Sequence, residues 1–121
     1  MSDIKRVPGS VVTRSQAVAY GGLVFTVATA VEKPADFYLQ MKDALRAVDK
    51  QLVAAGSDKS RVLTVTIYVA DVARKAEINR AWDEWVDRSH PPVRACAEVV
   101  LEGADLVELV VTAAAGHLAH G

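Results

Sequence analysis

Several features on which small proteins often rely are scarce or missing in this sequence. A single cysteine excludes an internal disulfide and a multi-cysteine metal cluster. Two phenylalanines, three tyrosines and two tryptophans are too few for an aromatic platform that stacks bases. Lysine and arginine are scattered, and the formal net charge is −1, so the chain has no basic footprint for a nucleic acid.

Long hydrophobic runs are missing as well. No stretch approaches the roughly 18 consecutive apolar residues of a membrane span, and the N-terminus has no hydrophobic core of a signal peptide. We therefore expect a cytoplasmic protein without a membrane partner. His117 and His120 form an H-x-x-H pair that lacks a third ligand, so we predict no metal site and no cofactor.

What remains is the composition of one globular domain. The chain has 121 residues, of which 51% are hydrophobic and 24% are charged. We predict a single domain over residues 1–121, in which 1–10 and 115–121 are loosely held ends.

Hydrophobic periodicity predicts two helices among several strands. One helix follows the N-cap candidate Asp36 and ends before Gly56, and a second runs from Asp71 to about Arg88, ahead of a Pro-Pro pair. Gly21-Gly22 indicates a hairpin turn. Alternating or β-branched runs predict strands at 16–20, 23–29, 61–70, 94–101 and 106–114.

The element order β-β-α-β-α-β-β predicts an α+β fold in which both helices cover one face of a sheet. The other face of that sheet still carries valine, leucine, isoleucine and threonine side chains. So much apolar surface is too large to leave to water in a chain of this size. We therefore expect a homo-oligomer that forms through this face.

The strand predicted at 94–101 carries a lone arginine, Arg94. Alternation places Arg94, Cys96 and Glu98 on one face and small apolar residues on the other. A guanidinium is always charged and has five donors in a rigid fork, so Arg94 could be a receptor for a carboxylate. The alternative is an exposed ion pair between Arg94 and Glu98, which would contribute little.

Further motifs occur in a defined order along the chain. They are Ser15-Gln16-Ala17-Val18, Gly22-Leu23-Val24-Phe25, Leu52-Val53-Ala54-Ala55-Gly56, Val65-Thr66-Ile67-Tyr68-Val69-Ala70-Asp71, Asn79 with Trp82, Pro92-Val93-Arg94-Ala95-Cys96-Ala97-Glu98-Val99, and Val107-Glu108-Leu109. Together they resemble the RidA/YjgF family of small imine and enamine deaminases, from Ser15 to Ala113.

The resemblance implies a chorismate-mutase-like homotrimer, with one site at each subunit interface. In the family, the arginine matching Arg94 holds the substrate carboxylate, and the backbone beside the residue matching Cys96 helps to bind the substrate nitrogen. The glutamate matching Glu108 helps to position the water that attacks a 2-imino or enamine carboxylate, which yields a 2-oxo acid and ammonia. The resemblance thus makes Glu108 and Cys96 the catalytic candidates. Cys96 has no nearby base in the sequence, so a pocket-lining thiol is the alternative to a nucleophile.

The chain departs from the family pattern near its start. Arg14 stands where active members have an aromatic residue, and Val27-Ala28 stands where they have Ser-Gly. Arg14 could supply a second cation and favour a longer or more acidic substrate. Either Thr26 or Thr29 could supply the missing hydroxyl, and we count Arg94, Arg14, Tyr20 and Ala28 as substrate-binding candidates.

Some assignments stay open at the level of sequence. Tyr20 could line the pocket or only pack. Glu108 could have a purely structural hydrogen bond, and the 102–105 turn would place it opposite either Glu98 or Val99. Asn79 and Trp82 are expected to fix the packing of the second helix. A non-catalytic protein that binds a small carboxylate is the alternative function, and the neutral charge makes ribonuclease activity a poor fit.

Overall fold

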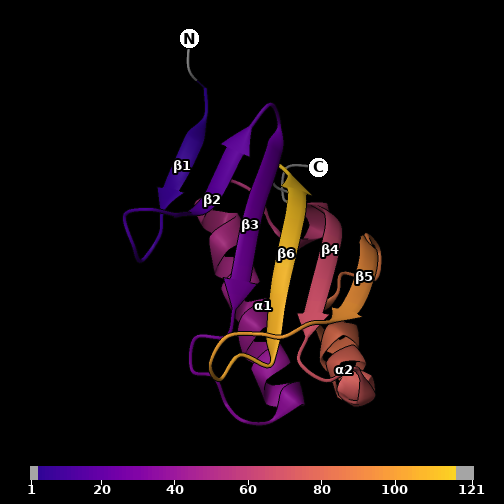
Figure 1. Ribbon diagram of the computed structural model, residues 1–121. Coiled ribbons are helices and arrows are strands. Elements are labelled where there is room, and N and C mark those ends of the chain that lie inside the picture. Colours follow the sequence, from indigo (N-terminus) through magenta and orange to yellow (C-terminus); the bar gives the residue numbers. More distant parts are fainter. Residues whose placement is uncertain (1–2, 117–121) are drawn as a thin grey trace.

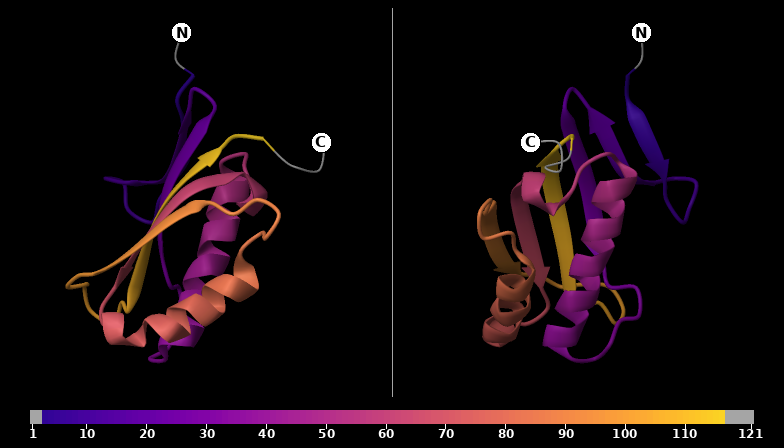
Figure 2. Two further views of the ribbon diagram at one scale, coloured as in Figure 1. Left: turned by 90° about the vertical axis from the view of Figure 1, so that its right-hand side faces the viewer. Right: turned by 180° about the vertical axis from the view of Figure 1, so that it is seen from behind.

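The computed structural model describes residues 3–116 as one six-stranded sheet with helices on one side (Figure 1). The elements are β1 (Lys5–Pro8), β2 (Ser15–Tyr20), β3 (Leu23–Thr29), α1 (Phe37–Ala54), β4 (Val62–Val69), α2 (Lys75–Trp85), β5 (Val93–Glu98) and β6 (Val107–Ala114). Short 3-10 turns at Lys59–Arg61 and Val72–Arg74 precede β4 and α2. The strand order is β1-β2-β3-β6-β4-β5, and both helices cover the same face (Figure 2). The predicted α+β fold is confirmed.

The predicted turns and caps form as the local chemistry requires. The side chain of Asp36 accepts a hydrogen bond from the Leu39 amide at 2.8 Å and so caps α1. Gly56 follows the end of that helix with φ of +90°, a left-handed conformation that glycine adopts without strain. Gly21 and Gly22 also have positive φ, at +60° and +81°, and they close the hairpin between β2 and β3.

Several boundaries differ from the prediction, most clearly near the N-terminus and at the end of the second helix. Residues 5–8 form β1 and pair with β2, although the segment 1–10 reads as a polar lead-in. The second helix ends at Trp85 rather than near Arg88, and Asp71 caps a 3-10 turn that precedes it. Residues 117–121, which include His117 and His120, lie outside the described residues.

The largest difference concerns the two C-terminal strands. They do not form a hairpin: β5 pairs in parallel with β4 at the sheet edge, and β6 inserts between β3 and β4. Short connections usually join neighbouring strands, which is why the sequence favours a hairpin. The placement of β6 depends instead on long-range pairing with β3 and β4, which come much earlier in the chain.

One face of the sheet packs against the helices and forms the core. Val24, Ile67 and Leu109 are fully buried there, as are Met41 and Leu45 from α1. A bulge between Val62 and Thr64 places Val62 on this covered face, where the simple alternation of β4 would have placed it on the other.

No helix or strand of the described residues covers the opposite face of the sheet (Figure 2). Leu23, Phe25 and Val27 of β3 point to this side, and Phe25 and Val27 are 45% and 51% exposed. Their register partners on β6 are Ala114, Thr112 and Val110. We call this surface the open face. No helix in the described part of the chain is long and apolar enough to cross a membrane.

Candidate functional site

Arg94 lies on the edge strand β5 with its side chain on the helix-covered side of the sheet. Its register partner on β4 is Val65, which is buried in the core. Arg94 Nη2 donates a hydrogen bond of 2.7 Å to Asn79 Oδ1 on α2. Its guanidinium carbon lies 5.3 Å from the centre of the Trp82 ring. The side chain is half-buried and held by two neutral groups of one helix.

Most of the donors of Arg94 remain unused. A guanidinium has five N–H groups, and Asn79 accepts from only one of them. Within residues 3–116, Arg94 has no carboxylate partner. An oriented cation with free donors at a sheet edge can receive a carboxylate through paired N–H···O bonds.

The alternative ion pair between Arg94 and Glu98 is wrong. A Glu98 carboxylate oxygen instead accepts a hydrogen bond of 2.8 Å from the Val72 amide, at the start of the turn that leads into α2. Glu98 therefore fixes the connection after β4 and does not neutralise the arginine.

Asn79 and Trp82 have a role that the sequence does not reveal. Their spacing places both on one side of α2, which predicts packing, and Trp82 is indeed buried. Only the parallel pairing of β5 with β4 brings Arg94 against these two side chains. Both residues orient the guanidinium in addition to fixing the helix.

Cys96 follows Arg94 on the same side of β5, opposite Ile67. Its thiol is free and half-buried. Within the described chain it has no hydrogen-bond partner that could act as a base. This position favours a pocket-lining thiol beside Arg94 over an activated nucleophile.

Glu108 lies on the open face, across the sheet from the side to which Arg94 points. Its register partners are Thr29 on β3 and Tyr68 on β4. The two positions considered from the sequence, opposite Glu98 or Val99, are both wrong because β6 does not pair with β5. The Glu108 side chain is half-buried, and its carboxylate has no hydrogen bond or ion pair with any residue from 3 to 116.

Thr26 and Thr29, which flank Val27-Ala28, differ in whether their hydroxyl groups are free to contact a ligand. The Thr26 hydroxyl is buried, donates to the Gln16 carbonyl at 2.7 Å and accepts from Gln51 Nε2 at 2.6 Å. Thr29 is half-buried on the open face beside Glu108. Thr29 is therefore the hydroxyl that is available next to the carboxylate.

The remaining substrate-binding candidates, Ala28, Tyr20 and Arg14, do not lie together in one site of a single chain. Ala28 is 2% exposed and points into the core, so only its backbone could face a ligand. Tyr20 pairs with Leu23, whose partner on β6 is Ala114, six positions from Glu108. At about 3.3 Å per residue, Tyr20 and Glu108 are roughly 20 Å apart along the sheet. Arg14 lies in the loop before β2.

Metal ligands do not cluster in the described part of the chain. No group of three or more histidine, cysteine, aspartate or glutamate side chains is placed to hold an ion in residues 3–116. The chemistry available at the site comes from Arg94, the Cys96 region, Glu108 and Thr29.

In residues 3–116 these features define a two-layer α+β domain, with an oriented arginine at one sheet edge and, on the uncovered sheet face, a carboxylate without a partner. The family model described as Endoribonuclease L-PSP matches residues 5–115. The chain therefore belongs to this family, which is the YjgF/RidA family.

Known relatives agree with this assignment. A RutC family protein of Haemophilus ducreyi is 39% identical over 105 residues, which cover 85% of this chain and 90% of the relative. The crystal structure of NMB1025, a member of the YjgF protein family from Neisseria meningitidis, superimposes with a TM-score of 0.88 at 35% identity. It covers 93% of this chain and 95% of that one.

A further relative bears a functional name. The Escherichia coli protein named "Putative reactive intermediate deaminase TdcF" is 29% identical over 105 residues, 80% of this chain and 81% of that protein. The family thus includes proteins named for the deamination of reactive intermediates.

Proposed function

We propose that this protein hydrolyses a reactive 2-imino or enamine carboxylate to a 2-oxo acid and ammonia. The proposal rests on the environment of Arg94: Asn79 and Trp82 hold its side chain in place, and most of its donors have no partner among residues 3–116. Such a group fixes one end of a carboxylate substrate and leaves the adjacent imine carbon to react.

The reaction needs little from the protein beyond orientation. Water adds to the imine carbon, the C–N bond breaks, and nitrogen leaves as ammonia after it gains the protons that the water supplies. An enamine first takes up a proton at carbon and releases one from nitrogen, which converts it to the imine. Glu108, whose carboxylate has no partner among residues 3–116, would accept a proton from the attacking water.

A single chain does not bring Arg94 and Glu108 together, because they point to opposite sides of the sheet. Arg94 lies at the β5 edge, whereas Arg14 lies in the loop between β1 and β2 at the other edge (Figure 1). In a cyclic head-to-tail assembly, opposite edges of neighbouring copies meet. We propose a homotrimer in which Arg94 of one copy and Glu108 of the next complete each site.

The open face supports this assembly. Phe25 and Val27 are about half exposed, and Leu23 lies beside them. An apolar surface of this kind on a small domain is stabilised when another copy covers it. The trimer would therefore bury the open face and build the sites in one step.

The proposal is tested by a coupled assay in which an amino-acid oxidase generates 2-iminobutanoate in situ. The wild-type protein is expected to accelerate ammonia release, and Arg94→Ala is expected to abolish that acceleration. Arg46→Ala, at an exposed arginine of α1, is the matched control and should keep full activity. No acceleration by the wild-type protein, or full activity in Arg94→Ala, would count against the proposal.

A second candidate function is binding of a small carboxylate without turnover. It is favoured by Val27 on the open face, where the family pattern has a serine hydroxyl. Binding of a 2-oxo acid that is lost in Arg94→Ala, without any release of ammonia from the imine, would select this alternative.

A further inference from the structure

The loop between β1 and β2 borders a groove that the mechanism above does not use. The groove has a volume of about 380 Å³ and lies between this loop and the end of β3. Arg14, Ser15, Gln16, Val27, Thr29 and Val31 are among the residues that line it. Of its lining residues, Arg14 is the only one that carries a charge. An anionic group is therefore the natural occupant of its polar end.

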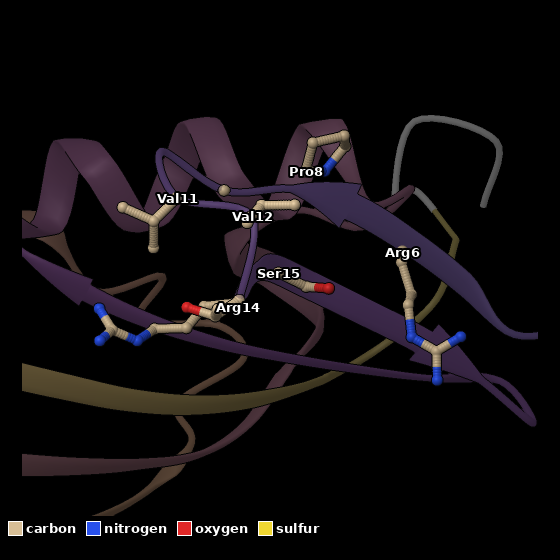
Figure 3. Close-up of a pocket in the computed structure, with 8 residues that line it drawn as sticks. Arg6, Pro8, Val11, Val12, Arg14 and Ser15 are labelled. Carbon is tan, nitrogen blue, oxygen red and sulfur yellow. The ribbon is translucent and has the colours of Figure 1, made fainter.

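Arg14 is available to a ligand. Its side chain is exposed, and within residues 3–116 its guanidinium makes no hydrogen bond, ion pair or ring contact. Figure 3 shows the hollow on the β1 side of the same loop, where the Arg14 side chain extends away from Arg6. The two arginines thus do not form one basic cluster.

The backbone that carries Arg14 is fixed by close packing. The Arg14 amide donates to the Val11 carbonyl at 3.3 Å, which closes a turn. A Cβ atom at Gly9 would lie 2.6 Å from the Arg14 carbonyl oxygen, so only glycine allows this approach. The loop therefore fixes the backbone position from which the Arg14 side chain extends.

The groove adjoins the proposed reaction site. Thr29 belongs to the groove lining and is also the register partner of Glu108. Neighbouring strands are about 4.8 Å apart, so a ligand whose reacting carbon lies at Glu108 can extend into the groove over a few carbon atoms. Val27 and Val31 would contact its methylene groups.

We propose that Arg14 binds a second carboxylate of the substrate, so that the preferred substrate class is a 2-imino dicarboxylate. The first carboxylate binds to Arg94 of one copy, and the second binds to Arg14 beside Glu108 of the next. This inference rests on the proposed function for the reaction and the assembly, whereas binding of the second carboxylate can be measured without turnover.

The test compares two ligands that differ by the second carboxylate. Calorimetry with 2-oxoglutarate and 2-oxobutanoate measures binding, and the corresponding imines, generated in situ, measure turnover. We expect Arg14→Gln to weaken 2-oxoglutarate binding about 10- to 100-fold, the usual contribution of a hydrogen bond between charged groups. Binding of 2-oxobutanoate should change less than about twofold, and Arg14→Lys should recover part of the loss because it restores the charge.

Arg6→Gln is the matched control, because Arg6 is also exposed and lies on β1. Equal losses for both ligands in Arg14→Gln, or the same loss in Arg6→Gln, would overturn the inference. If no imine is hydrolysed but 2-oxoglutarate binds in an Arg14-dependent way, the proposed reaction fails and the second carboxylate site stands. If both imines are hydrolysed equally well by wild type and Arg14→Gln, the reaction stands and the inference fails.

Discussion

The two faces of the sheet are built from the same strands, but one is buried under the helices and the other is partly exposed. On β6, Leu109 is fully buried under the helices, whereas the adjacent Glu108 and Val110 are half-buried on the open face. On β3, Val24 is fully buried and Phe25 is 45% exposed. The covered face holds the domain together. The open face carries apolar surface and the Glu108 carboxylate, which has no partner within residues 3–116.

The two faces differ in whether a single chain can complete them. The covered face is complete within one chain, because α1 and α2 fill it with apolar side chains. The open face is incomplete within one chain, because its valine and phenylalanine side chains lack a cover and Glu108 lacks a partner in residues 3–116. We therefore expect substitutions on the two faces to act through different equilibria.

The largest expected effect on folding comes from the covered face. Leu109→Ala should lower the free energy of unfolding by about 2–5 kcal/mol, because it removes buried methyl groups and leaves a cavity. Chemical denaturation followed by circular dichroism measures the change. The loss should be present at every protein concentration. A loss below about 1 kcal/mol would show that this face is not the core.

A substitution on the open face should act on assembly instead. Phe25→Lys places a charge where the proposed trimer buries an aromatic ring, so we expect monomers in light scattering and loss of deaminase activity. The stability of wild type should rise with protein concentration, and that of Phe25→Lys should not. If Phe25→Lys forms an oligomer of the same mass as wild type, the open face does not mediate assembly.

Asn79 tests the role of Arg94, because its side-chain oxygen accepts a hydrogen bond from the guanidinium. Asn79→Asp keeps the shape of the side chain but places a carboxylate against Arg94 Nη2, where the amide oxygen now lies at 2.7 Å. The new ion pair should compete with the substrate and raise KM about 10- to 100-fold, while the melting temperature stays within a few degrees. An unchanged KM would mean that Arg94 does not bind the substrate carboxylate.

The smallest expected effect concerns Asp49, which joins the two helices. Its carboxylate accepts from Trp85 Nε1 at 3.0 and 3.1 Å. Burial raises the pKa of Asp49, and the bond from Trp85 and the nearby Lys59 charge partly oppose the rise. Because the folded pKa lies above the unfolded one, the ionised group costs stability at neutral pH, and that cost falls as the pH drops through the folded pKa.

Asp49→Asn removes this cost and keeps an acceptor for the indole. We expect a small gain in the free energy of unfolding at pH 8, because solvent screens this partly exposed carboxylate, and the gain should shrink toward pH 4. Asp49→Ala should instead lose about 1 kcal/mol, because the Trp85 N–H is left unpaired. Thermal unfolding across this pH range checks both signs. A gain in Asp49→Asn that does not depend on pH would contradict the cause assigned here.

Local chemistry allowed much of the fold to be predicted. The signals for α1 and the first hairpin are local in the sequence. Asp36 and Gly56 mark the two ends of α1, and Gly21-Gly22 forms the hairpin turn. Strand β1 was missed because four mostly exposed residues have no periodicity of their own and pair only because β2 is there. The early end of α2 depends on the turn after Trp85, ahead of Pro91.

The candidate site was harder to predict, because the order of the strands in the sheet determines which side chains come together. Alternation correctly groups Arg94 with Cys96, but no local signal tells that β5 runs parallel to β4 or that β6 enters the middle of the sheet. That topology places Arg94 against Asn79 and Glu108 beside Thr29. The resemblance to a family supplied the candidate residues, and the geometry shows which of them one chain cannot bring together.

The central claim is that each site combines Arg94 of one copy with Glu108 of another. Arg94→Ala and Glu108→Gln should each be inactive alone. When equal amounts are dissociated and reassembled together, random mixing gives about a quarter of the sites both native residues, so about a quarter of wild-type activity should return. If the mixture stays inactive while wild type recovers under the same treatment, the site lies within one chain and the account is wrong.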